Sequence, residues 1–152
     1  MQRSQVNCLG NLQYNYSMRA YLPLSPSDIA LFLSSKSIQA TKLYAPTIKF
    51  LTENVGHDEE EIEYMLSLLA ARDAMELVNG NQKTGTLLAL EIESKEIAVE
   101  ESDSIVLTGE LVWNRVECLF TSVLDEEGDI ELTWYATQEI EDQLAIIALG
   151  NR

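Results

Sequence analysis

The sequence is short of the residues that build many catalytic and metal sites. It contains two cysteines and one histidine. Cys8 and Cys118 form no closely spaced pair, so a disulfide scaffold is not expected. His57 is the only histidine, so multi-histidine metal sites are excluded and a Ser–His–Asp triad could use only this residue as its histidine. Since the glycines also form no phosphate-binding loop, we expect no metal and no cofactor.

Long hydrophobic runs are missing as well. No apolar stretch approaches the roughly 18 residues that cross a bilayer. Residues 1–17 have neither the hydrophobic region nor the small-residue cleavage site of a secretory signal. A chain of 152 residues that is 46% hydrophobic can form one domain with one sizeable core. We therefore expect a cytoplasmic protein without a membrane partner.

Positive charge is the third shortage. Ten lysines and arginines face 25 acidic residues, which gives a net charge of −15. Residues 90–142 hold 16 acidic and two basic residues, a net of −14 (2 − 16). This charge opposes contacts with phosphate backbones, so nucleic-acid binding is not expected. The acidity serves either solubility or attraction of a protein with a basic surface, and the sequence does not separate the two.

The first half of the chain alternates strands and helices. Residues 1–17 are polar and lack periodicity, so we predict a disordered N-terminal extension, followed by a single domain over residues 18–150. Strands are predicted over 19–24 and 38–45, and helices over about 25–36 and 46–55. The best-marked helix begins at Asp58, which has the spacing of a capping box with Glu61, and runs to about residue 79.

The second half reads mainly as strand. Alternating segments at 86–93, 97–99, 105–107, 116–124 and 130–136 predict strands, and the last two flank a turn that is typical of a hairpin. In this hairpin Trp134 falls on the same face as Cys118 and is predicted to be a core residue. The elements together predict an α+β domain, with about three or four helices packed against a mixed or mainly antiparallel sheet of about five or six strands.

Asp73 and its neighbour Arg72 are the first candidate binding residues. Asp73 falls near the centre of the apolar stripe of the helix at 58–79. A carboxylate in that position needs a donor, and Arg72 or a backbone amide is the nearest one in sequence. A structural ion pair or cap is the simpler interpretation of Asp73, and a role in a site is the alternative.

The joint between the last strand and the last helix holds the other candidates. Thr137 suits the cap of that helix, and Glu139 adds negative charge to its first turn. Tyr135, which alternation turns away from Trp134, and Gln138 have no such explanation. The acidic turn at 125–129 has the ligand density of a calcium loop but not the spacing of an EF-hand, so no dedicated metal site is expected there.

Three segments carry a resemblance to a known family. They are MRAYLPL at 18–24, DEEEIEY at 58–64 with AAR at 70–72, and LTWYATQEI at 132–140. They resemble an uncharacterised domain family of actinobacteria over residues 18–143, and the closing segment is the most specific. Family members typically begin at the equivalent of Met18 and often have an acidic insertion where this chain has only residues 125–128. The resemblance implies one cytoplasmic domain and brings no activity, cofactor or catalytic residue.

Two classes of function fit these observations. The favoured one is a non-catalytic protein-interaction or regulatory domain whose partner is a protein with a basic surface. The other is a small-ligand-binding domain or an enzyme with its site at Tyr135, Gln138 and Glu139. A concave pocket at that joint containing Arg72 or Arg19 would favour the second class, because an arginine would balance the carboxylates and orient a ligand.

Overall fold

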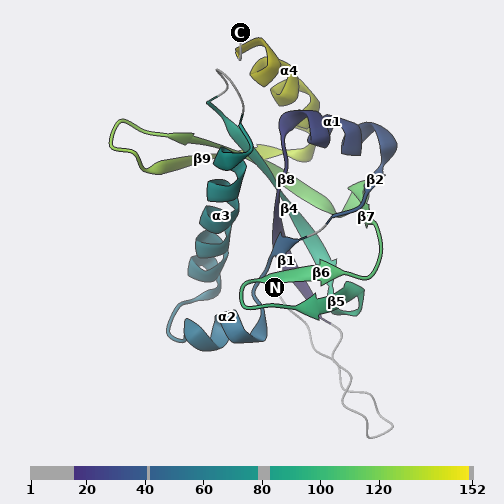
Figure 1. Ribbon diagram of the computed structural model, residues 1–152, viewed down its shortest axis with the longest axis vertical. Coiled ribbons are helices and arrows are strands. Elements are labelled where there is room, and N and C mark those ends of the chain that lie inside the picture. Colours follow the sequence, from purple (N-terminus) through teal and green to yellow (C-terminus); the bar gives the residue numbers. More distant parts are fainter. Residues whose placement is uncertain (1–15, 41, 79–82, 151–152) are drawn as a thin grey trace, which may run out of the picture.

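A seven-stranded antiparallel sheet forms the middle layer of the protein (Figure 1). The structure is a computed structural model, and it describes residues 16–40, 42–78 and 83–150. The helices α2 and α3 cover one face of the sheet, and α1 and α4 cover the other. The resulting three layers confirm the α+β class.

The strand order in the main sheet is β5-β6-β3-β1-β4-β8-β9, and each neighbouring pair is antiparallel. Its strands are β1 (Ser17–Pro23), β3 (Leu43–Tyr44), β4 (Gly85–Glu93), β5 (Ile97–Glu100), β6 (Ser104–Leu107), β8 (Val116–Leu124) and β9 (Ile130–Ala136). A separate two-stranded sheet pairs β2 (Ser37–Ile38) with β7 (Leu111–Val112). The predicted mainly antiparallel pairing is confirmed.

Side-chain caps begin three of the four α-helices in the described part of the chain. The helices are α1 (Pro26–Ser35), α2 (Ile48–Glu53), α3 (Glu59–Glu76) and α4 (Ile140–Gly150). Ser25 caps α1, Thr47 caps α2, and Asp58 caps α3 through the predicted capping box. Within the described part of the chain, no helix is both long and apolar enough to span a membrane.

The central strands have buried side chains on both faces. One cluster of buried residues joins β1 and β4 to Phe32 of α1 and Ile140 of α4. The second cluster joins the opposite face to Leu66 of α3 and Phe50 of α2. β4 is buried on both faces over most of its length, which explains why its sequence reads as a nearly continuous apolar run.

The sheet differs from the prediction in size and in where it starts. It has seven strands rather than five or six, and the segment 38–45 forms the short strands β2 and β3 in two different sheets instead of one strand. β1 begins at Ser17, and the carbonyl of Tyr16 accepts a hydrogen bond from the Ser94 amide at 2.8 Å. The first described strand and its contacts therefore begin at residues 16 and 17, inside the predicted extension. Residues 1–15 of the predicted extension and residue 79, the predicted end of the helix that begins at Asp58, lie outside the described residues, and α3 itself ends at Glu76.

Trp134 is not a core residue, so this prediction was wrong. Alternation places it correctly beside its cross-strand partner Phe120, but its side chain is 56% exposed. β9 is an edge strand, and α3 packs mainly over the more central strands β1 and β4. Tyr135, on the other face, packs against the cluster under α1 and α4. Alternation thus predicts correctly that Trp134 and Tyr135 lie on opposite faces of β9, but it does not predict which of the two faces is covered.

Candidate functional site

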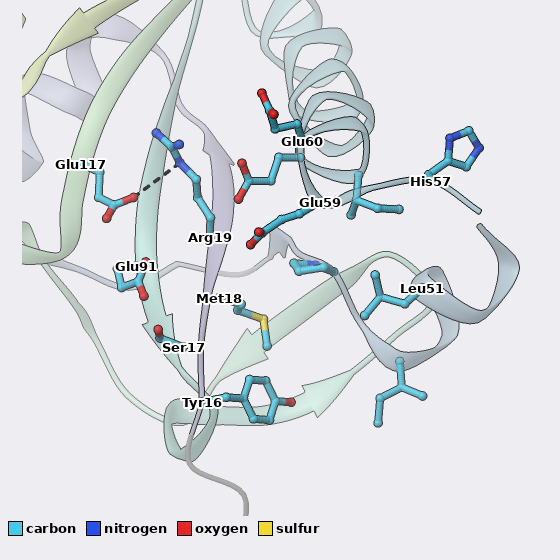
Figure 2. A pocket seen from close by; sticks show the side chains of 14 residues that line it. Tyr16, Ser17, Met18, Arg19, Leu51, His57, Glu59, Glu60, Glu91 and Glu117 are labelled. Atoms are coloured by element: carbon cyan, nitrogen blue, oxygen red, sulfur yellow. Dashed lines mark ion pairs between the residues drawn. The ribbon is translucent and has the colours of Figure 1, made fainter. Parts of the chain in front are cut away.

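A cavity of about 820 Å³ opens between β1, α2 and the beginning of α3 (Figure 2). Five glutamates line it: Glu59, Glu60, Glu63, Glu91 and Glu117. Its apolar lining includes Pro46, Ile48, Leu51 and Ile62, and Arg19 lies among the carboxylates. Each part of this lining comes from a different segment of the chain. The cavity therefore has an acidic end and an apolar end.

The start of α3 supplies three of the five carboxylates. The Glu61 amide donates to the Asp58 carboxylate at 2.8 Å, and the Asp58 amide donates to the Glu61 carboxylate at 2.9 Å. These reciprocal bonds fix the first turn of the helix. Glu59 and Glu63 then lie one turn apart, on one side of the helix. Figure 2 shows Glu59 reaching towards the cavity, and His57, just before the helix, also belongs to its lining.

A β-bulge in β8 brings the fifth carboxylate next to Arg19. Ala89 of β4 pairs with Cys118, but the next residue, Leu90, pairs with Val116, so Glu117 is the extra residue. The Glu117 carboxylate lies 3.4 Å from Nε of Arg19 (Figure 2). Strict alternation along β8 cannot predict this position.

Arg19 is held by weak partners. Its Nη2 donates to the Cys118 sulfur at 3.0 Å, and sulfur is a weak acceptor. Its Nε is buried and has no hydrogen-bond partner, since the contact with Glu117 is an ion pair without hydrogen-bond geometry. Burial alone would lower the pKa of Arg19, but Cys118, Tyr21 and Glu117 together raise it. Arg19 therefore stays charged and neutralises one glutamate of the cavity.

The other carboxylates have no such neutralisation. Among the described residues, no lysine, arginine or histidine nitrogen lies within 4.0 Å of the carboxylates of Glu59, Glu63 or Glu91. Burial raises the pKa of Glu63, and the neighbouring Glu59 raises it further, against the opposing effect of Arg19. Burial and Glu91 likewise raise the pKa of Glu117. The acidic end of the cavity thus favours a bound positive charge.

The apolar end is carried by α2, which is anchored at its first turn. Thr47 accepts a hydrogen bond from the Phe50 amide at 3.0 Å and donates to the Ser102 carbonyl at 2.7 Å. Phe50 is buried beneath the helix. Ile48 and Leu51 are on the exposed side and line the cavity. The helix is thus fixed to the domain while it presents apolar side chains to solvent.

Asp73, the first sequence-predicted candidate, has a structural role. Its carboxylate accepts a hydrogen bond of 2.6 Å from the hydroxyl of Tyr44, whose ring is buried. A structural partner was predicted, but the donor is neither Arg72 nor a backbone amide. Arg72 is exposed and does not line the acidic cavity.

The structure does not bring the candidates at the strand-to-helix joint into the cavity. Tyr135 packs against the core, Gln138 is exposed, and the Glu139 carboxylate accepts from the Ala136 amide at 2.9 Å. That contact replaces the predicted cap by Thr137, because Thr137–Glu139 form a short 3₁₀ turn before α4. Asp73 and Tyr135 lie on opposite faces of the sheet.

The acidic turn between β8 and β9 gathers Asp125, Glu127 and Asp129, whose carboxylate oxygens lie within 4.8 Å of one another. The Asp125 carboxylate already accepts from the amides of Glu127 and Asp129, both at 2.9 Å. These bonds explain the turn as a local structure.

The residues of the acidic cavity were mostly missed by sequence reasoning. Arg19 was named only as a possible member of a site at a different place. The acidic helix start at 59–63 is explained in sequence by its capping box, and Glu91 and Glu117 are two acidic residues among the 25 in the chain. Arg19 and Glu91 share one signal, a charged residue at an inward-alternating position of a strand, and the two are paired directly in the β1–β4 register.

Comparison with known proteins identifies a family without an assigned role. The model of a family of unknown function (DUF6912) matches residues 18–127. The closing segment at 132–140, on which the resemblance partly depended, lies beyond the matched range. No curated protein and no solved structure matches the chain. The matched range covers the sheet core, α1 to α3 and every glutamate of the acidic cavity, and the chain belongs to this family of unknown function.

Proposed function

We propose that this protein is a non-catalytic, cytoplasmic binding domain whose acidic cavity takes a positively charged segment of a partner protein. The observation that carries the proposal is the cavity itself, where five glutamates surround a single arginine beside an apolar wall. A cavity of about 820 Å³ is within the usual size range of ligand sites.

The charge balance supports a cationic ligand. Arg19 pairs with Glu117, which leaves four glutamates of the lining without a neutralising partner among the described residues. An anionic ligand would meet this excess negative charge, whereas a cation would relieve it. The net charge of −15 extends the same field over the rest of the molecule and would speed the approach of a basic partner.

A peptide-binding experiment tests the proposal. A fluorescent peptide containing lysine and leucine is titrated with the protein, and the same peptide with glutamate in place of lysine is the control. We expect binding of the lysine peptide alone, with affinity that falls as salt is raised. Absence of binding at low salt, or equal binding of both peptides, would refute the proposal.

A matched pair of variants locates the binding. Glu59→Gln/Glu63→Gln removes two charges from the start of α3, inside the cavity. Glu141→Gln/Asp142→Asn removes two charges from the start of α4, where both side chains are exposed. Both pairs change the net charge by the same amount and remove acidic side chains near the N-terminal end of a helix. We expect the first pair to weaken binding at least about fivefold and the second to change it little. Equal losses would mean that the effect comes from net charge alone.

A further inference from the structure

The apolar side of the cavity continues onto an exposed patch on α2. Ile48 and Leu51 are one helical turn apart, and Val55 lies in the turn that follows the helix. Their exposed fractions are 71%, 45% and 82%. These three side chains are here called the α2 patch, and two of them, Ile48 and Leu51, also line the cavity. Grouped exposure of this kind marks an interaction surface more often than scattered single residues do.

The acidic end lies across the same cavity from the α2 patch. Figure 2 shows Leu51 on one side of the opening and Arg19, Glu117 and Glu91 on the other. Glu59 lies between them at the start of α3. A ligand that contacts both the acidic end and the α2 patch must therefore carry a positively charged group and an apolar group next to each other.

The extent of the surface favours a peptide over a small cation. Val55, four residues after Leu51, is exposed and lies outside the cavity lining, so the exposed apolar side chains of this segment are not confined to the cavity. A small polyamine would fill the acidic end and leave the α2 patch exposed. A peptide segment can place one side chain in the cavity and the next on the patch.

We infer that the partner segment carries a basic side chain next to a bulky apolar one. The basic side chain binds among Glu59, Glu63 and Glu91, and the apolar side chain packs on the α2 patch. This inference rests on the proposed function and adds the chemistry of the partner and its orientation in the site.

Double-mutant cycles between peptide and protein test the orientation. The probe is the acetylated and amidated peptide Ser-Gly-Lys-Leu-Gly-Ser, with one variant that has glutamine for lysine and another that has serine for leucine. The protein variants are Glu63→Gln, for the acidic end, and Ile48→Ser, for the α2 patch. Ile146→Ser is the matched control, since Ile146 is an exposed isoleucine on α4, away from the cavity lining. Affinities are measured by NMR titration, and amide spectra show whether each variant is folded.

We expect Glu63→Gln and the loss of the peptide lysine to be coupled, and Ile48→Ser and the loss of the peptide leucine to be coupled, each by a factor of about five. The Ile146→Ser variant should bind like the unchanged protein. Crossed or absent couplings, while the lysine peptide still binds, would overturn the inference and leave the proposed function standing. Failure of every lysine-containing peptide to bind would overturn both.

Spermidine serves as the small-cation probe in the same titration. We expect it to bind more weakly than the peptide and to be insensitive to Ile48→Ser. Tighter binding of spermidine than of the peptide would overturn the inference in favour of a small cationic ligand.

Discussion

Removing the hydrogen bond between Tyr44 and Asp73 tests directly whether Asp73, a binding residue predicted from the sequence, has a structural role. Tyr44→Phe removes the hydroxyl and keeps the buried ring, including its contact with Lys42, whose ammonium lies 4.7 Å from the ring centre. The bond is 2.6 Å long with a carboxylate acceptor, so it belongs to the stronger, charge-assisted class. Hydrogen bonds to charged groups contribute roughly 1.5–3 kcal/mol.

The expected loss lies at the lower end of that range. Asp73 is half-buried, so water can reach its carboxylate when the hydroxyl is gone. We therefore expect Tyr44→Phe to lower the free energy of unfolding by about 1.5 kcal/mol. Burial, and after it the bond to Asp73, raises the pKa of Tyr44, so the hydroxyl remains a donor at neutral pH.

Urea unfolding followed by circular dichroism measures the effect, with an unchanged dependence on urea as the sign of an intact fold. Combining Tyr44→Phe with Asp73→Ala completes a cycle, and we expect a coupling of about 1 kcal/mol or more. Coupling below about 0.3 kcal/mol would refute the structural role argued for Asp73. Both single variants should bind the lysine peptide normally, because neither residue lines the cavity.

Three further predictions concern stability. Glu63 and Glu117 have raised pKa values in the folded state, so the folded protein binds protons more readily than the unfolded chain. The free energy of unfolding should therefore rise as pH falls through these raised pKa values towards the pKa of an ordinary glutamate. Urea unfolding at several pH values should show a smaller rise for Glu63→Gln/Glu117→Gln. A rise of unchanged slope in that variant would assign the effect to other groups. Trp134→Ala should cost less than about 1 kcal/mol and Tyr135→Ala about 2 kcal/mol, and the reverse order in urea unfolding would show that the faces of β9 are exchanged. Gly85→Ala should lower the free energy of unfolding by about 1–3 kcal/mol, because its new methyl group would lie 2.6 Å from a buried hydroxyl and 3.0 Å from the backbone of α3; an unchanged urea midpoint would mean that the site has room.

Local features could be predicted from the sequence because their physical cause is local. The capping box of Asp58 and Glu61 involves residues three apart, and it begins α3 where predicted. The hairpin of β8 and β9 follows from alternation on both sides of a turn-forming segment. Net charge needs only counting. The α+β class follows from the order of such elements.

The tertiary structure alone decided how faces are covered and which distant residues meet. Alternation placed Trp134 and Tyr135 on opposite faces, but whether a helix covers either face depends on packing elsewhere in the chain. The donor to Asp73 comes from 29 residues away in sequence.

The acidic cavity combines both kinds of information. The sequence by itself determined an excess of negative charge and the acidic start of α3. Only the fold decided that β1, with Arg19, lies beside β4 and that a bulge turns Glu117 towards it. The physical reason is that the sequence records which side chains a strand presents, whereas strand order and register, which depend on the packing of the whole core, decide what those side chains face.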